Sequence, residues 1–338
     1  MRMEGRRLDT TLRHLGGCLR GAPLPGIDWP RLVALADAHF LGPRLHRALA
    51  QGGQAQGQDR EALDYLETLD ALNGARNRRL SAQLGELVDA LQSRGIVPTI
   101  LKGGAHLARC LGRDTLPSRM MRDLDLLIRA DQGEDAARVL RACGYDRFAE
   151  DPGPHSMGCY FRPSDVGAVD MHVSLPPLVA RLVPPGEMAR RTTAIRAGSR
   201  VLTVPDASLQ FVINLGHEMA HDEALVSGFV DLRYLLELID LARDGAGDLD
   251  WDWIRATSGG WKLSLGLEVQ DRMARHLGFA GFPGIGRTAM GRLLHERRLF
   301  KMAHRRIGQA EWRVIRHVNR LRHSVARHHR PTPLQSRV

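Results

Sequence analysis

A change in the spacing of apolar residues divides this chain of 338 residues into three parts. From about residue 8 to 94, apolar residues recur every three or four positions, which is typical of amphipathic helices. Short strand-like runs then alternate with helical segments, and helical spacing returns beyond Pro205. We predict an α+β fold in which a small mixed β-sheet core at residues 96–205 is flanked by helical regions at 1–95 and 206–338.

Two aspartates mark the expected starts of helices. Asp28 precedes WPRLVALADAHF, which has Pro30 in its first turn, and Asp131 precedes the helical stretch QGEDAARVLRACG. The short side chain of aspartate accepts a hydrogen bond from a free backbone N–H of the first turn. We therefore expect both aspartates to be N-caps.

The composition contains no sign of a membrane or secretory segment. No stretch approaches the roughly 20 apolar residues that a membrane-spanning helix needs, and the first residues lack the apolar run of a signal peptide. The four cysteines, Cys18, Cys110, Cys143 and Cys159, are scattered without the CxxC spacing of metal ligands. We therefore expect a cytoplasmic protein with reduced thiols.

The positive charge is concentrated near the end of the chain. The net charge is +10, and 45 of the 48 basic residues are arginines. Residues 287–330 alone carry a net charge of +11, and Trp312, Ile315 and Val318 recur there at helical spacing. Such a basic C-terminal helix could bind an acidic partner, such as RNA or an acidic peptide. The alternative is that its apolar side packs on the protein and its arginines lie in water.

The run RDLDLLI carries two carboxylates in an otherwise apolar strand. Asp123 and Asp125 are two residues apart, so in a strand they project from the same side. Carboxylates this close repel each other unless a cation neutralises them, and Mg²⁺ commonly bridges one or two carboxylates to substrate phosphates. A later strand-like run, AVDMHVSL, offers Asp170 as a third acid, with His172 on the same side. The alternative is that the carboxylates lie on a solvated face.

The segment TILKGG, shortly before these acids, has the features of a phosphate site. A strand-like run ends in Gly103 and Gly104 and leads into a helix, an arrangement that presents backbone N–H groups to an anion. Lys102 and Arg119 can add cationic contacts. The GxxxxGK[ST] order of a P-loop is absent from the sequence. These four residues are the predicted nucleotide-binding set.

Together these motifs resemble the nucleotidyltransferase (polymerase β-like) superfamily. The order LKGG, Arg119, DLDLLI and VDMH is similar in particular to the bacterial proteins called uncharacterised nucleotidyltransferases. The resemblance implies transfer of a nucleoside monophosphate from a nucleoside triphosphate, with ATP as the expected donor and two Mg²⁺ ions as cofactors. The implied acceptor is a small molecule or a peptide natural product, with RNA less favoured.

On this resemblance, Asp123, Asp125 and Asp170 match the catalytic, metal-binding acids, and His172 matches the histidine after the third acid. Gly104 departs from the superfamily's usual serine, which removes a loop hydroxyl from the phosphate site. The first alternative is a protein of the same fold without catalysis, such as a nucleotide-binding or partner-binding component of a toxin–antitoxin system.

The sequence HEMAH, from His217 to His221, matches the HExxH motif of zinc metallopeptidases. In that motif two histidines one helical turn apart bind zinc, and the glutamate acts as general base. The extended HExxHxxGxxH pattern fails, because Ala224 and Ser227 occupy the positions of the glycine and the third histidine. We favour a helix that borders the nucleotide site, with His217 and His221 near the acceptor, and the zinc peptidase is the second alternative.

Overall fold

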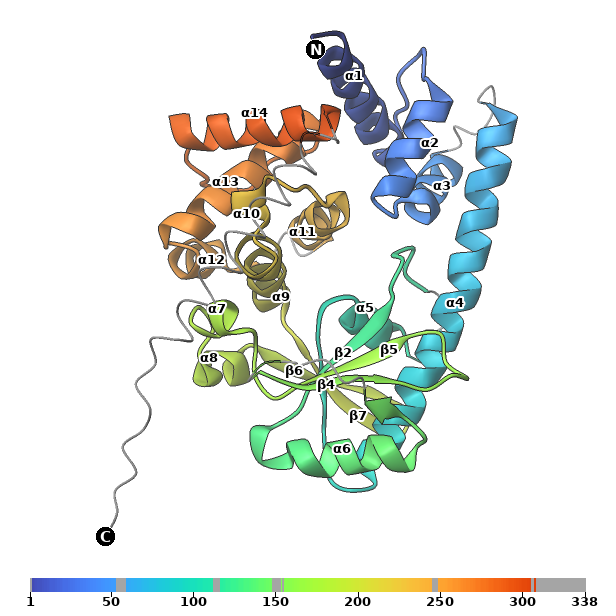
Figure 1. Cartoon of the computed structure of the whole chain (residues 1–338), viewed down its shortest axis with the longest axis vertical. Helices are drawn as coiled ribbons and strands as arrows, with labels where there is room; N and C mark the ends of the chain where they lie inside the picture. The colour runs from blue at the N-terminus through green and yellow to red at the C-terminus, as the bar shows by residue number, and fades with distance from the viewer. Residues whose placement is uncertain are drawn as a thin grey trace.

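The computed structural model describes residues 2–52, 59–111, 116–147, 153, 155–244, 249–304 and 307. A mixed β-sheet lies at one end of this part of the chain, and helices from both ends of the sequence lie at the other end (Figure 1). The long helix α4 runs along both parts. The α+β fold with flanking helices, predicted from the sequence, is confirmed.

The helices that precede the sheet are α1 (Arg2–Leu19), α2 (Trp29–Ala38), α3 (Gly42–Gln51) and α4 (Arg60–Gln92). The strands are β1 (Thr99–Ile100), β2 (Asp123–Leu127), β3 (Asp146–Arg147), β4 (Ser156–Phe161), β5 (Ala168–His172), β6 (Thr192–Ala197) and β7 (Arg200–Pro205). Helices α5 (Lys102–Cys110), η1 (Ala130–Gln132), α6 (Gly133–Ala142), α7 (Pro177–Ala180) and α8 (Pro185–Arg190) lie between strands. The helices after the sheet are α9 (Ala207–Gly216), η2 (His217–His221), α10 (Ala224–Ser227), α11 (Leu232–Asp244), α12 (Trp251–Thr257), α13 (Trp261–His276) and α14 (Ala289–Ala303).

The strands of the described residues form one sheet in the order β3-β4-β5-β2-β1-β7-β6. β2 runs parallel to β5 and β1 runs parallel to β7, whereas the other neighbouring pairs are antiparallel. The two strands that carry the predicted acids, β2 and β5, are therefore direct neighbours in the middle of the sheet.

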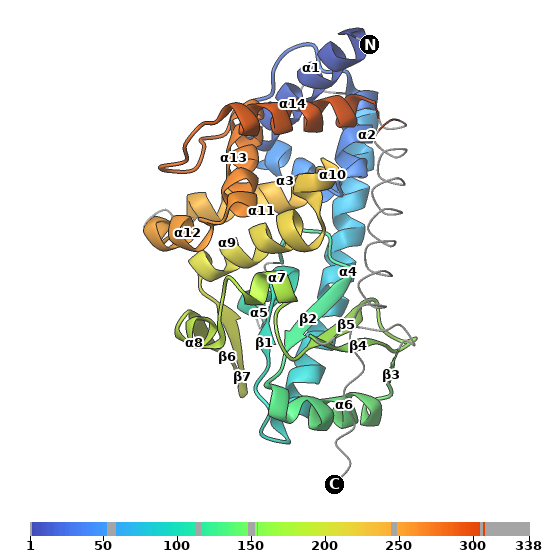
Figure 2. The ribbon, with the colours of Figure 1, turned by 60° about the vertical axis from the view of Figure 1, so that its left-hand side comes forward.

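Two hydrophobic cores stabilise the structure. The first joins helices from both ends of the sequence, with Leu12 of α1, Phe211 of α9 and Val269 of α13 in one buried cluster. The second packs the leucines of α4 from Leu80 onward, together with α6, against the sheet. The predicted N- and C-terminal helical regions thus share the first core, which is seen above the sheet in Figure 2. Helix α4 connects this core to the sheet, because its Leu66 lies in the first core and its later leucines lie in the second.

The start of the sheet differs from the expectation. β1 contains only two residues, and α5 begins at Lys102, so Gly103 and Gly104 lie in the first turn of the helix and not before it. The prediction that Asp28 caps a helix is confirmed by its hydrogen bond from the backbone N–H of Arg31.

The prediction that Asp131 is an N-cap is wrong. The chain first forms the short 3₁₀ helix η1, and Gln132 is the residue that precedes α6. The carboxylate of Asp131 instead pairs with Arg129 at 2.6 Å. A charged partner two residues away offers this aspartate an alternative to the backbone N–H groups of the helix.

β6 and β7 form a hairpin that the sequence analysis missed. Ala197 pairs with Arg200 across a two-residue turn. Its first residue, Gly198, has a φ of +64°, in the left-handed region that glycine adopts without a clash at Cβ. A glycine in a two-residue loop between strand-like runs is a hairpin signal, so the sequence did contain the information.

Two further expectations concern compartment and partners. No helix among the described residues is long and apolar enough to cross a membrane, and within the same residues the four cysteines form no disulfide. The basic segment beyond residue 307, with its predicted acidic partner, lies outside the described residues.

The buried His295 of α14 makes the stability of the first core depend on pH. Burial and the nearby charges of His276, Arg298 and Arg272 lower the pKa of His295 to about 4, against about 6.5 in an unfolded chain. Between these values the unfolded state binds a proton that the folded state does not. We therefore expect the free energy of unfolding to fall as the pH drops from about 6.5 to about 4, with His295 contributing up to about 3 kcal/mol.

Urea unfolding of the wild type and of His295→Leu at several pH values measures this contribution. The variant should lose part of the acid dependence. Identical slopes for the two proteins between pH 6.5 and 4 would contradict the assignment of a buried neutral imidazole.

Candidate active site

The predicted metal-binding acids lie in the middle of the sheet. In β2, Leu124 and Leu126 pack into the core beneath the sheet, and Asp123 and Asp125 alternate with them on the opposite face. Asp125 is the register partner of Asp170 on the parallel strand β5, so both carboxylates share that face. An apolar strand can carry two acids here because its two faces have different environments.

Asp125 is the most buried of the three acids, with 4% of its surface exposed. Its Oδ1 accepts a hydrogen bond from Lys102 Nζ at 2.7 Å and lies 3.2 Å from His172 Nε2. Burial opposes the negative charge, but the Lys102 ammonium and the hydrogen bond with His172 outweigh it and hold the pKa of Asp125 below its usual range. This carboxylate is therefore ionised and available to a cation.

His172 lies between two of the acids. Its Nε2 is 3.3 Å from Asp170 Oδ2 as well as close to Asp125. Burial disfavours the imidazolium, but hydrogen bonds with both carboxylates raise the pKa of His172 to about 9. Ser156 of β4 donates a second hydrogen bond to Asp170, at 3.3 Å. These contacts put His172 in a position to orient Asp170.

Asp123 occupies a more open position at the start of β2. Desolvation by the surrounding protein, and then the negative charge of Asp125, raise the pKa of Asp123. Asp123 lies outside the compact group formed by Asp125, Asp170 and His172, whose ligand atoms are all within 4.8 Å of one another. The structure thus brings two of the three predicted acids into direct proximity and places the third beside them.

Lys102 reaches Asp125 from the first residue of α5. Its backbone has a φ of +48°, which a residue with a side chain seldom adopts. Leu101 N–H donates to the backbone oxygen of Asp125 at 3.0 Å, and Gln210 Nε2 of α9 donates to that of Lys102 at 3.2 Å. Burial alone would lower the pKa of Lys102, but the Asp125 carboxylate raises it above its usual range. Contacts from two elements therefore hold this strained residue in place.

Gly103 and Gly104 are buried in the first turn of α5. A Cβ on Gly104 would lie 2.8 Å from Ile100 Cγ2, and a Cβ on Gly103 would lie 3.0 Å from Met121 Cγ. The glycines allow α5 to pack closely against β1 and against the segment before β2. Their contact with phosphate stays a prediction, and this packing is a structural reason for glycine at both positions.

Arg119 lies in a segment that α4 holds in place. Asn77 Nδ2 donates to the backbone oxygens of Pro117 and Arg119, at 3.0 and 2.9 Å. The guanidinium of Arg119 forms an ion pair with Glu237 of α11, which also accepts a hydrogen bond from Asn214 of α9. Arg119 is therefore bound to a helix of the first core. A phosphate that contacts Arg119, as predicted, would share the guanidinium with Glu237.

The HEMAH segment forms a π-helical turn, η2, at the end of α9. The rings of His217 and His221 lie with their centroids 4.9 Å apart and their planes inclined by 58°, and Asp222 Oδ2 lies 3.2 Å from His217 Nδ1. His155 connects this turn to the acids: its ring meets that of His221 edge-on at 6.0 Å and stacks on that of His172 at 5.9 Å. The histidine pair therefore borders the acid group.

Glu218 points away from this histidine pair. Its carboxylate pairs with Arg298 at 3.5 Å and accepts a hydrogen bond from Gln270, inside the helical core. Burial raises the pKa of Glu218 to about 8, against the opposing charge of Arg298. A general base has to reach the metal-bound water, so this geometry argues against the zinc peptidase alternative.

The sequence analysis missed several residues of this region. His155, Ser156 and Asp222 contact the predicted site residues, and the hydroxyl of Tyr234 on α11 lies 3.5 Å from His217 Nδ1. Asp222 directly follows HEMAH, so a search for carboxylates beside the histidine pair would have found it. The other three carry no motif, because tertiary packing alone brings them here.

The acid group fits Mg²⁺. Magnesium prefers oxygen ligands and commonly binds through one or two carboxylates plus substrate phosphates. Asp125 and Asp170 supply such oxygens from adjacent strands, and Asp123 adds a third carboxylate beside them. These three residues could hold the ion, with His172 orienting Asp170.

The sequence model of the uncharacterised nucleotidyltransferase family matches residues 25–277, a range that contains the whole sheet and the acids. The chain belongs to this family. The resemblance found in LKGG, DLDLLI and VDMH is thereby confirmed. No curated protein and no solved structure gives a match to this chain.

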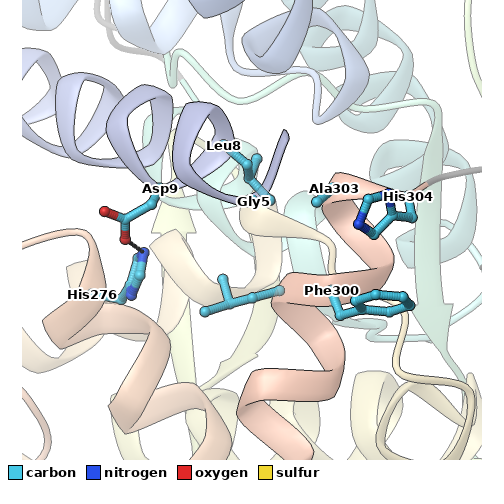
Figure 3. A pocket seen from close by; sticks show the side chains of 8 residues that line it. Gly5, Leu8, Asp9, His276, Phe300, Ala303 and His304 are labelled. Carbon is cyan, nitrogen blue, oxygen red and sulfur yellow. Dashed lines mark ion pairs between the residues drawn. The ribbon is translucent and has the colours of Figure 1, made fainter. Parts of the chain in front are cut away.

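The protein also has a surface hollow on its helical core. It is lined by Gly5, Leu8, Asp9, His276, Leu299, Phe300, Ala303 and His304 (Figure 3). These residues come from α1, α13, α14 and the position directly after α14, and the polar groups of the lining include the Asp9–His276 ion pair, at 3.0 Å. Its eight lining residues include neither lysine nor arginine, the residues expected to contact phosphate.

The strained backbone of Lys102 gives a test that separates conformation from charge. Lys102→Gly and Lys102→Ala both remove the ammonium that neutralises Asp125, but only alanine keeps a Cβ in the left-handed region. We expect the glycine variant to be more stable than the alanine variant by about 1 kcal/mol in urea unfolding. If the alanine variant is at least as stable as the glycine variant, the backbone of residue 102 is not strained.

The hydrogen bonds of Asn77 give a second test. Asn77→Ala leaves two backbone oxygens of the segment around Arg119 without their donor, so we expect a loss of about 1–3 kcal/mol in unfolding free energy and weaker nucleotide binding. Arg79→Ala is the matched control. Arg79 lies on the same helix as Asn77, and its guanidinium donates to the exposed backbone oxygen of Ser164. Equal losses in the two variants would show that the segment does not depend on Asn77.

Proposed function

We propose that this protein transfers a nucleoside monophosphate from a nucleoside triphosphate, with ATP as the expected donor, to an acceptor hydroxyl in a Mg²⁺-dependent reaction. The observation that carries the proposal is the compact group of Asp125, Asp170 and His172, with the Lys102 ammonium 2.7 Å from Asp125. Membership of a nucleotidyltransferase family supports the reaction class.

In this reaction the acceptor oxygen attacks the α-phosphorus, the bond from that phosphorus to the bridging oxygen breaks, and pyrophosphate leaves. Mg²⁺, when bound, offsets the charge of the triphosphate and of the attacking and leaving oxygens, and two ions are expected. Asp123, Asp125 and Asp170 are the proposed ligands. Of the two acids in the compact group, Asp170 is the better placed to accept the acceptor's proton, because 33% of its side chain is exposed while Asp125 is enclosed.

The cations of the site have a matching role. Lys102 neutralises Asp125, and its ammonium would be free to contact a phosphate oxygen if Asp125 held a metal ion. His217 and His221 border the acids through His155, so they are the proposed acceptor side. The acceptor proposed from the sequence, a small molecule or a peptide natural product, would meet them there.

Transfer of label from α-labelled nucleoside triphosphates tests the proposal. We expect the purified protein, mixed with cell extract and Mg²⁺, to label a metabolite or a peptide. Chelation of Mg²⁺ should abolish the labelling, and Asp125→Asn and Asp170→Asn should each reduce it at least about 100-fold, because each removes a charge that the transition state requires. Asp131→Asn is the matched control, since that exposed carboxylate contacts Arg129 outside the site.

The same assay distinguishes the alternatives. Nucleotide that binds without any transfer of label would favour the inactive, partner-binding alternative. Labelling that persists in Asp125→Asn and Asp170→Asn would contradict the assignment of the acids. Label on RNA would change the acceptor but not the reaction class.

A further inference from the structure

A second group of potential metal ligands lies beside the acids. His217, His221 and Asp222 each offer one ligand atom, and the three atoms lie within 4.8 Å of one another. Imidazole and carboxylate together are typical ligands of zinc and similar metals, whereas Mg²⁺ takes oxygen ligands. We propose that these three residues form a second metal site, which binds a divalent transition metal of the zinc type.

The π-helical turn brings the three ligands together. The backbone N–H of Asp222 donates to the backbone oxygen of His217 at 2.8 Å, five residues back, and so closes the wide turn η2. The two histidines, four positions apart, then lie on one side of the turn, and the carboxylate of Asp222 lies beside the ring of His217. Single π-helical turns within helices occur frequently at functional sites.

The distances agree with a shared ion. His217 Nδ1 and Asp222 Oδ2 are 3.2 Å apart. The ligand atoms of a tetrahedral zinc ion with bonds of about 2.0–2.1 Å lie about 3.3–3.4 Å from one another. His221 and Asp222 are both exposed, so they can turn toward an ion without any movement of buried side chains.

The second site borders the acid group but shares no ligand with it. His155 lies between them, in ring contact with His221 on one side and His172 on the other. The proposed metal site does not depend on nucleotidyl transfer, since all three of its protein ligands are present without a nucleotide.

Metal binding here would not make the protein a peptidase. The glutamate of HEMAH, Glu218, lies in the helical core with Arg298 and Gln270 and faces away from the histidine pair. Two imidazoles and one carboxylate leave a fourth position of a tetrahedral ion open, as in sites that hold a water or a substrate atom. The two histidines of the motif can thus bind a metal, but Glu218 is not in a position to act as its general base.

Binding of Zn²⁺ to the full chain in excess Mg²⁺ tests the proposal. Calorimetry should give one zinc ion per chain under these conditions, and Co²⁺ should show the visible absorption of a low-symmetry nitrogen and oxygen site. His221→Ala and Asp222→Asn should each weaken zinc binding at least about 100-fold, because loss of a direct ligand exceeds the 10–100-fold cost of losing an outer partner. Both side chains are exposed, so circular dichroism should show a retained fold.

His46→Gln is the matched control. His46 Nδ1 lies 3.1 Å from Asp70 Oδ2, a contact like that of His217 and Asp222, but no third ligand joins it among the described residues. Its loss should leave zinc binding unchanged.

Two results would overturn the proposal. If zinc binding survives in His221→Ala and Asp222→Asn but is lost in Asp170→Asn, the ion belongs to the acid group. If the wild type binds no zinc in excess Mg²⁺, the contact of His217 with Asp222 is an ordinary ion pair.

Discussion

The neutralisation of one buried carboxylate, that of Asp125, constrains the rest of the structure. An unpaired charge at 4% exposure would cost several kcal/mol, and two cations from different elements prevent this. Lys102 comes from the first residue of α5, where the chain accepts a strained φ, and His172 comes from β5. A shift of β5 by one residue would turn His172 and Asp170 to the opposite face. The register of β2 and β5 and the start of α5 are therefore fixed by the same ion cluster.

The site also depends on the relative position of the two hydrophobic cores. Arg119 from the sheet side pairs with Glu237 of α11, and Gln210 of α9 binds the backbone of Lys102. Both partners belong to helices of the first core, which also contains α1–α3. α4, with 33 residues, packs on both cores and holds the segment of Arg119 through Asn77. Helices from distant parts of the sequence thus shape a site whose acids lie on two strands.

The sequence predicted the acids and the fold class because these are local properties. A spacing of two in a strand places Asp123 and Asp125 on one side whatever the rest of the chain does, and the change of periodicity marks the sheet. The sequence could not predict that Glu237 pairs with Arg119 or that Tyr234 approaches His217, because both depend on how α11 packs against the sheet. The hairpin of β6 and β7 differs from these contacts, because Gly198 in its two-residue turn is a local signal that the sequence does contain.

The HEMAH turn shows why a short motif does not determine chemistry by itself. Neighbouring positions of a helix point in different directions, so a histidine and the next residue can have unrelated environments. Here His217 faces Asp222 and Glu218 faces Arg298 in the core, where burial raises its pKa to about 8. A carboxyl group held in that way is committed to packing. The same five residues can therefore offer metal ligands to one side and a structural acid to the other, and the side that borders Asp170 and His172 decides which chemistry is available to the protein.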